Sequence, residues 1–141
     1  MTQDRDEHIG SWNDGWLAWT AQPGVTWVHR PGAGTWRIGK EDTAIGSVTL
    51  DGPYADSVWF VRHYFGEANI ARYDLRTHAI AEAPDGVNTD VPEYRLSASG
   101  DHLVFRRGEP NAGKMLLFKL SSGAHRAIAV DTIQRFIAQG R

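Results

Sequence analysis

Short apolar runs and tight turns alternate along almost the whole chain. The runs are rich in β-branched and aromatic residues, and glycine, proline, asparagine or aspartate bounds them, which is the pattern of short strands joined by hairpins. The pattern predicts strands at about 7–12, 16–20, 25–30, 35–38, 45–50, 57–63, 68–74, 79–82, 93–97, 102–107, 114–120 and 125–129. We therefore expect an all-β fold.

Three segments of the chain align with one another without a gap, namely 29–36, 73–80 and 118–125. Each reads as a strand end, a tight turn and a strand start, and the segments begin 44 and 45 residues apart. A self-similar period of this length is typical of four-stranded antiparallel units. The sequence thus predicts a single domain of three such units, which cover about 7–40, 44–83 and 92–129.

The second strand of each unit is nearly continuous in apolar residues, as in 57–60. Such a run is expected where both faces of a strand are covered. Outer strands such as 118–120 alternate apolar and polar residues, as expected with one face in water. We therefore expect both faces of the second strand in each unit to be covered.

The C-terminal residues break the strand pattern and predict a short helix at about 131–139. Asp131 is a suitable N-cap, and Ile133, Phe136 and Ile137 fall on one helical stripe. A helix this short is marginal alone in water, so its stripe is expected to dock on the third unit or on a partner chain. These three apolar residues are therefore candidates for oligomer contacts.

Residues 91–105 and 116–123 resemble the repeat of TolB-type propellers, which belong with the WD40-like β-propellers. In that family a strand ends in a Ser-Pro-Asp-Gly-like corner, a Leu/Ile-Val-Phe strand follows, and the third strand runs into a Ser/Thr-Gly turn. The resemblance is clear in the third unit, extends to 73–77 in the second, is weaker in the first, and covers about 8–128. Here the corner reads Ser-Ala-Ser-Gly at 97–100, which changes the stiffness of the turn more than the topology.

The resemblance implies propeller-like blades, and families of this type close a ring with about six or seven of them. Three blades in an open arc would leave two blade faces exposed. We therefore expect a second copy to complete the ring as a homodimer, because two-fold cyclic assembly is the commonest oligomer. The alternative is a monomeric β-barrel or sandwich built from the same strands.

Composition narrows the function classes. The 141 residues carry a formal charge of −2, which supplies no electrostatic footprint for nucleic acid. The absence of cysteine excludes disulfides, thiolate catalysis and cysteine-ligated zinc. The start of the sequence is polar and no apolar run is long enough to span a membrane, so we expect a cytoplasmic protein without a membrane partner.

Five of the six tryptophans fall in the first unit. Trp12 and Trp27 lie near strand ends and are candidates for stacking on a sugar ring or an extended peptide, because an indole offers a large face and an N–H donor. Trp19, Trp36 and Trp59 are expected in the core.

His63, Tyr64 and Phe65 occupy the predicted tip of a hairpin in the second unit. Loops on a rigid scaffold often carry binding residues. These three residues are therefore candidates for contact with a partner or a ligand.

The six histidines show none of the spacings that aim two imidazoles at one metal ion, and aspartates in the predicted loops are typical turn-formers. The sequence therefore assigns no metal, no cofactor and no catalytic residue. It favours a non-catalytic binding or scaffold module that contacts a protein or peptide. A carbohydrate-binding lectin that uses the tryptophans and a propeller-type lyase or hydrolase are the alternatives.

Overall fold

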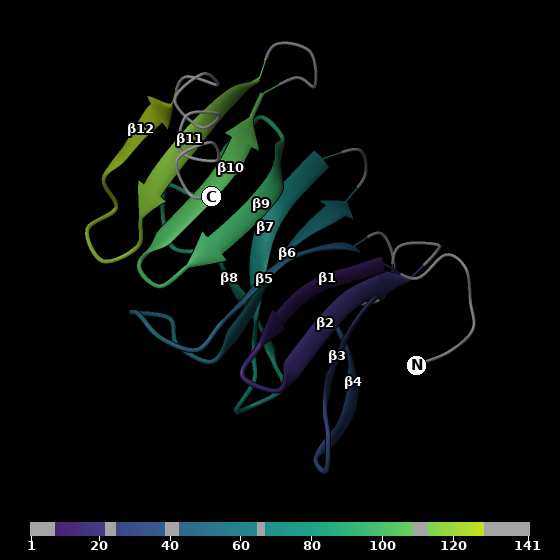
Figure 1. The fold of residues 1–141 in the computed structure, drawn as a ribbon. Helices are drawn as coiled ribbons and strands as arrows, with labels where there is room; N and C mark the ends of the chain where they lie inside the picture. The colour runs from purple at the N-terminus through teal and green to yellow at the C-terminus, as the bar shows by residue number, and fades with distance from the viewer. Residues whose placement is uncertain (1–7, 22–24, 39–42, 65–66, 109–112, 129–141) are drawn as a thin grey trace, which may run out of the picture.

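The computed structural model describes residues 8–21, 25–38, 43–64, 67–108 and 113–128. These residues form three four-stranded sheets and no helix (Figure 1). The predicted all-β fold of three four-stranded antiparallel units is confirmed. The helix predicted at 131–139 lies outside the described residues, together with Ile133, Phe136 and Ile137.

The strands follow chain order within each sheet, and every neighbouring pair is antiparallel. The first sheet contains β1 (His8–Asn13), β2 (Trp16–Ala21), β3 (Val25–Arg30) and β4 (Gly34–Ile38). The second contains β5 (Thr43–Thr49), β6 (Ser57–Tyr64), β7 (Glu67–Asp74) and β8 (Ile80–Glu82). The third contains β9 (Glu93–Ser99), β10 (His102–Arg107), β11 (Lys114–Lys119) and β12 (His125–Ile128).

Turn chemistry explains why the hairpins form where the sequence predicts them. Asp14 and Gly15, between β1 and β2, have φ angles of 44° and 84°. A two-residue hairpin turn with both φ angles positive matches the right-handed twist of the strands, and aspartate followed by glycine is a preferred pair for it. The repeat also extends to the backbone, because Leu75 N donates to Asp56 O and Leu120 N donates to Asp101 O at equivalent corners.

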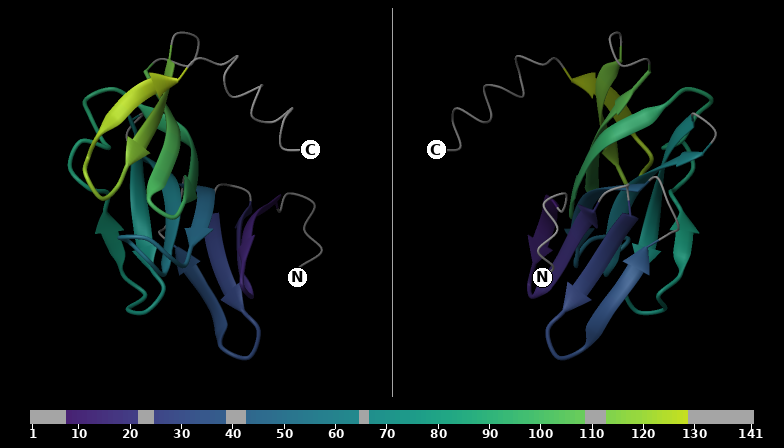
Figure 2. Two further views of the ribbon diagram at one scale, coloured as in Figure 1. Left: turned by 60° about the vertical axis from the view of Figure 1, so that its left-hand side comes forward. Right: turned by 90° about the vertical axis from the view of Figure 1, so that its right-hand side faces the viewer.

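The three sheets pack face to face in chain order, with the second sheet between the other two (Figures 1 and 2). The first strand of each later sheet lies across the sheet before it: β5 contacts β1, β2 and β3, and β9 contacts β5, β6 and β7. The first strand of a sheet shifts its register with the second strand of the same sheet, at Ile9/Ser11 where β1 pairs with β2 and at Ile45/Ser47 where β5 pairs with β6. The third sheet has its own shift opposite Val104/Arg106, so each sheet carries a β-bulge near the same place.

Two hydrophobic clusters fill the spaces between the sheets. Between the first and second sheets the cluster contains Trp16, Ala18, Val28, Ile38, Val48, Val58, Phe60, Ala71, Tyr73 and Leu75. Between the second and third sheets it contains Trp59, Val61, Ala68, Ile70, Val87, Leu96, Leu103, Phe105, Leu116, Phe118 and Leu120. Successive residues of β6 enter opposite clusters, which explains the continuous apolar run in that strand.

The prediction that the second strand of each unit is covered on both faces is confirmed for β6 and wrong for β2 and β10. In β2 the buried residues Trp16 and Ala18 alternate with partly exposed ones, and in β10 Leu103 and Phe105 do the same. The reason is the place of these strands in the stack. The first and third sheets stand at its two ends, and among the described residues each has only the second sheet beside it.

Matching serines link the adjacent sheets. Ser11 Oγ in β1 accepts a hydrogen bond from Val48 N in β5 at 3.0 Å. Ser47 Oγ in β5 accepts one from Ala98 N in β9 at 2.9 Å. The same kind of contact therefore joins the first sheet to the second and the second to the third.

Candidate functional site: the two end faces

The first sheet turns one face away from the second, and we call it the first end face. It carries Leu17 and Trp19, which alternate along β2 with the core residues Trp16 and Ala18. Residues opposite one another on paired strands share a face, so Trp12, opposite Leu17, and Trp27, opposite Trp19, belong to it as well. Among the described strands, none packs against this face.

Trp12 is the most exposed large side chain of the first end face. It is 71% exposed, whereas Val48, which follows the equivalent serine in β5, is 4% exposed. Leu17, Trp19 and Trp27 are half-buried. Trp19 Nε1 is shielded from solvent and has no hydrogen-bond partner within the described residues. The face thus presents three indoles and a leucine at positions where the second sheet has covered side chains.

The third sheet turns the opposite kind of face outward, which we call the second end face. Val104 and Arg106 alternate along β10 with the core residues Leu103 and Phe105. Leu117 and Met115 lie opposite them on β11 and therefore on the same face. All four side chains of this face are half-buried.

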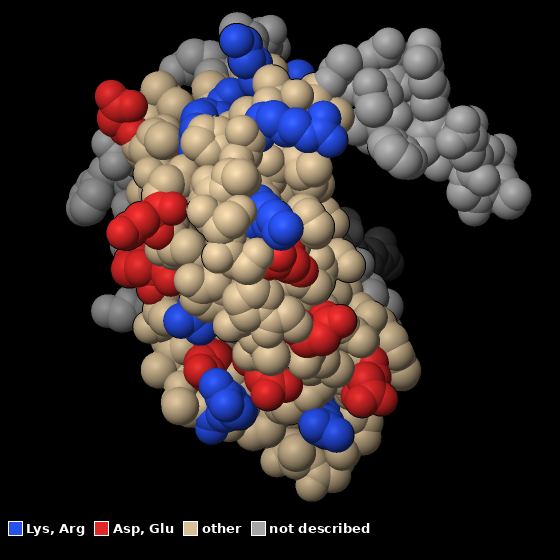
Figure 3. Space-filling model, turned by 90° about the vertical axis from the view of Figure 1, so that its left-hand side faces the viewer, with Lys and Arg blue, Asp and Glu red and all other residues tan. Residues whose placement is uncertain are grey.

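A cavity of about 250 Å³ lies beside the second end face. Its lining is His102, Leu117, Lys119, Ala124, His125 and Arg126. Figure 3 shows several Lys and Arg side chains at the upper end of the molecule, where an acidic side chain also lies, and Lys and Arg interspersed with Asp and Glu further down. The second end face therefore has an apolar centre and a cationic margin, a chemistry that suits aromatic faces and anionic groups.

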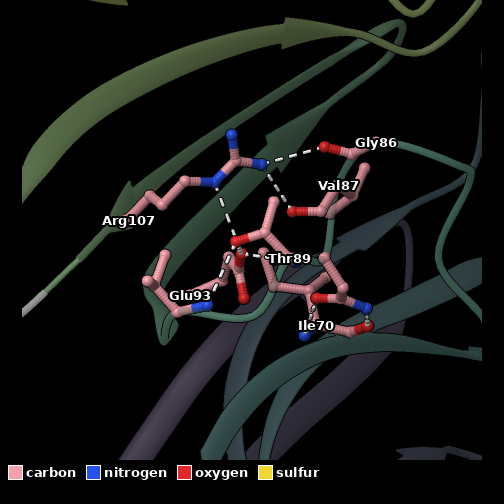
Figure 4. A network of polar contacts seen from close by, with 8 residues as sticks. Ile70, Gly86, Val87, Thr89, Glu93 and Arg107 are labelled. Carbon is pink, nitrogen blue, oxygen red and sulfur yellow. Dashed lines mark hydrogen bonds and ion pairs between the residues drawn. The ribbon is translucent and has the colours of Figure 1, made fainter.

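A buried carboxylate lies near the same sheet (Figure 4). Glu93 in β9 is fully buried, and its Oε1 accepts hydrogen bonds from Thr89 N at 2.7 Å and Thr89 Oγ1 at 2.6 Å. Arg107 Nε lies 3.3 Å from the same oxygen, while Arg107 Nη2 donates to Gly86 O and Val87 O. Burial raises the pKa of Glu93, against the lowering effect of these partners.

The network holds the segment that connects the second sheet to the third. Asn88 in that segment donates through Nδ2 to Ile70 O and accepts from Ile70 N, both at 2.7 Å. The arrangement fixes the connecting loop to β7 on one side and to Arg107 of β10 on the other. Among the described residues, no group of three His, Asp or Glu side chains comes close enough to hold a metal ion. Through its contacts with Thr89 and Arg107, Glu93 helps to hold this connecting loop in place.

The structure brings two of the sequence-predicted candidates together. Trp12 and Trp27 share the first end face. His63 and Tyr64 end β6, opposite Ala68 and Glu67, so the hairpin lies where it is predicted. Phe65 lies outside the described residues.

The predicted core tryptophans differ from one another. Trp59 is fully buried, and its Nε1 donates to Thr49 Oγ1 at 3.0 Å. Trp36 is partly buried against the first cluster and stacks on His78 with ring centroids 4.4 Å apart. The placement of Trp19 in the core is wrong, because it lies on the first end face, where no described sheet covers it.

Sequence reasoning missed Ser97, Val104 and Leu117. A signal for the first of them is present, because Ile-Gly-Ser occurs at 9–11 and at 45–47, and Leu-Ser occurs at the matching place in β9. Val104 and Leu117 carry no such signal, since their neighbours Leu103 and Phe118 are equally apolar and are buried.

Comparison with known proteins gives a fold without a family. No family model matches the chain, and no curated protein matches it. A solved structure described as "putative TolB from Agrobacterium tumefaciens" is similar, with a TM-score of 0.67 and 12% sequence identity over 89% of this chain. This chain has a propeller-like fold. It spans half the length of that structure, since the match covers 50% of the other chain.

At 12% identity the similarity concerns the fold alone. The three sheets correspond to propeller-like blades, as the resemblance of their repeats implies. In the part of the chain that the structure describes, no helix is long and apolar enough to cross a membrane.

Proposed function

We propose that this chain is a non-catalytic interaction module that binds another polypeptide through its two end faces. The observation that carries the proposal is the exposure of Trp12, which is 71% exposed at a place where the second sheet has a covered valine. Contiguous apolar patches on protein surfaces mark contact sites, and tryptophan is enriched among the residues that dominate binding energy. The propeller-like fold is consistent with this role.

The shape of the first end face favours a polypeptide over a small ligand. It is one whole face of a four-stranded sheet, across which Trp12, Trp19 and Trp27 are spread over three neighbouring strands. The same face of the second and third sheets is covered by another sheet of this chain. Sheet faces pack on one another about 10 Å apart through interdigitated side chains. A partner that presents a sheet face of its own therefore fits best.

The test compares two matched substitutions of exposed apolar residues. Native cross-linking and mass spectrometry would identify bound polypeptides, and calorimetry would then measure their affinity for the purified chain. Trp12→Asp is expected to weaken binding at least tenfold, about 1.4 kcal/mol. Ile80→Asp, which changes an apolar residue 42% exposed on β8 of the second sheet, should leave the affinity unchanged. A partner whose affinity is the same for Trp12→Asp, Leu117→Asp and the wild type would refute the proposal.

The exposed indole of Trp12 also supports a second candidate, a glycan-binding site that includes Trp27. Stacking of a sugar ring on an indole would change the intrinsic fluorescence of the tryptophans. A titration with mono- and oligosaccharides distinguishes the two candidates. The lectin hypothesis expects a saturable change that Trp12→Ala or Trp27→Ala abolishes, whereas the interaction module expects no response to sugars.

A further inference from the structure

The two end faces are the unmatched halves of a contact that the chain makes twice internally. At the first join, Ser11 Oγ accepts from Val48 N, and at the second, Ser47 Oγ accepts from Ala98 N. Ser97 is the third serine of this series, in register with Val104 as Ser11 is with Ala18 and Ser47 with Trp59. It is exposed, and its hydroxyl makes no hydrogen bond within the described residues.

The donor that would match Ser97 is a backbone N–H of the first sheet, that of Trp12. Val48 and Ala98 each follow the serine of their own strand, and the residue that follows Ser11 is Trp12. The backbone N–H of Trp12 therefore stands at the position from which Val48 and Ala98 donate to a preceding sheet. The described residues thus contain two completed serine contacts. Ser97 Oγ is the acceptor of a third contact, and the backbone N–H of Trp12 occupies the position of its donor.

The side chains around these atoms repeat the same complementarity. Facing the preceding sheet, Val58 and Phe60 of β6 are buried, and Leu17 and Trp19 stand at the matching positions of β2. Val58 and Phe60 are covered by the first sheet, which precedes their own. For the first sheet no described sheet plays that part. Facing the following sheet, Trp59 is buried in the second sheet, whereas the equivalent Val104 in the third is half-buried.

We propose that the partner is a second copy of this chain, whose second end face covers the first end face of this one. At each contact Trp12 N–H of one copy donates to Ser97 Oγ of the other, and the side chains of Trp12 and Leu17 pack on Val104 and Leu117. This inference rests on the proposed function, because it names the polypeptide that the end faces bind.

The number of copies follows from the geometry of closed rings. Head-to-tail contacts make a ring if the rotation closes and an open filament if it does not. Propellers close with about four to eight blades. The described residues of each copy form three sheets, and the one multiple of three in that range is six. Two copies therefore close a ring, in which both end faces of each copy are covered.

Charge supports this head-to-tail orientation over one that joins two second end faces. Arg106 stands at the register position of Thr20, whose Oγ1 accepts from Ile45 N at the first join. In the second copy the corresponding strand position is Ile9, which pairs with Trp19. A guanidinium beside an indole is a favourable cation–π contact. Two second end faces brought together would instead oppose their cationic margins, which carry Lys119 and Arg126.

The first experiment measures the mass of the purified chain by light scattering over a range of concentrations. The wild type is expected at about twice the chain mass of 15.7 kDa. Trp12→Asp and Leu117→Asp should each weaken dimerisation at least tenfold, whereas Ile80→Asp should not. Circular dichroism of each variant establishes that it is folded, and Ser97→Ala supplies a milder change that is expected to weaken the dimer without touching the core.

A mixture of the two aspartate variants distinguishes the head-to-tail contact from its competitors. Each variant keeps one intact end face, so an equimolar mixture can form one native contact per pair, and dimers should appear that neither variant forms alone. If Leu117→Asp dimerises as the wild type does while Trp12→Asp does not, two first end faces meet each other and the proposal is wrong. Growth beyond two copies at high concentration also overturns it.

A concentration-independent monomer overturns the inference while leaving the proposed function standing, provided that another polypeptide binds the wild type and loses affinity for Trp12→Asp. The two failures are therefore distinguishable. If neither self-association nor a Trp12-dependent partner is found, both fall.

The second experiment uses the absence of cysteine from the chain. A variant with both Trp12→Cys and Ser97→Cys should form an intermolecular disulfide under mild oxidation and run as a covalent dimer on a non-reducing gel. Each single variant is the matched control, because a lone cysteine at either position faces no cysteine across the proposed contact. Equal cross-linking by the single and the double variants would contradict the proposed pairing.

Discussion

Glu93 shows how one residue can couple stability to pH in this protein. Its carboxylate is fully buried, and Thr89 and Arg107 supply its polar partners. Burial disfavours the charged form and raises the pKa above its ordinary value of 4.5. A raised pKa means that this group contributes stability fully below the ordinary value and loses it as the pH rises through the raised pKa.

We expect Glu93→Gln to remove this part of the pH dependence. The difference in free energy of unfolding between the variant and the wild type should shift in favour of the variant as the pH increases above 4.5. Urea titrations at several pH values measure it, and Asp90→Asn, at an exposed position, is the control. A difference that does not vary with pH would show that Glu93 titrates alike in the folded and unfolded chain.

Among the elements, the bulge of β5 makes the second join possible. A Cβ atom at Gly46 would lie 2.8 Å from Leu96 Cδ2 and 3.0 Å from Trp59 O, so the absence of a side chain lets β9 approach closely. The bulge and the glycine therefore set the spacing of the second and third sheets.

Gly46→Ala is expected to lower the free energy of unfolding by roughly 1–3 kcal/mol, the usual cost of overpacking. Leu96→Ala alone should also destabilise the protein, because it opens a cavity. The double variant should be more stable than the sum of the two effects predicts, since the smaller side chain makes room for the new methyl group. Strict additivity in thermal or urea unfolding would mean that the two residues are not in conflict.

The serine series yields a matched pair of substitutions in equivalent strands. Ser47→Ala leaves Ala98 N–H without its acceptor at a part-buried join and is expected to cost about 1–2 kcal/mol. Ser97→Ala should change the stability of the dilute monomer by less than about 0.5 kcal/mol, because no described group bonds to it. Equal losses for the two variants, measured at concentrations where no association occurs, would contradict this reading of the joins.

At the scale of the whole molecule, the second sheet holds both hydrophobic clusters together. β6 sends Phe60 into one cluster and Trp59 into the other. A substitution that disrupts the second sheet is therefore expected to weaken the packing on both of its sides. A substitution on an end face is expected to weaken the packing on one side or on neither.

The same chemical change at two tryptophans tests this arrangement. Trp59→Ala removes a fully buried indole and its hydrogen bond to Thr49, and we expect a loss of about 3–5 kcal/mol. Trp12→Ala removes an indole that is 71% exposed and should stay within about 0.5 kcal/mol of the wild type in the dilute monomer. Chemical denaturation followed by circular dichroism measures both. Similar losses would mean that Trp12 is buried in the monomer.

The sequence predicts the strands and their grouping well. The strand predicted at 102–107 is β10 (His102–Arg107), and the one at 25–30 is β3 (Val25–Arg30). Turn residues and β-forming runs act over a few neighbours, so they can be recognised in one chain. The roles of Trp19 and Trp59 could not be told apart in this way, because both lie in apolar second strands and differ only in what packs against them.

What the chain alone defines is thus its repeated local chemistry: the positive-φ turns, the apolar runs, and three sheets of four strands. The packed structure assigns each residue its environment. It buries Glu93, exposes Trp12, and leaves Ser97 without the partner that Ser11 and Ser47 have. The hydrogen bonds that join one sheet to the next link residues as far as 35 to 51 positions apart, as from Asn13 to Val48 and from Ser47 to Ala98, and no local pattern encodes such contacts.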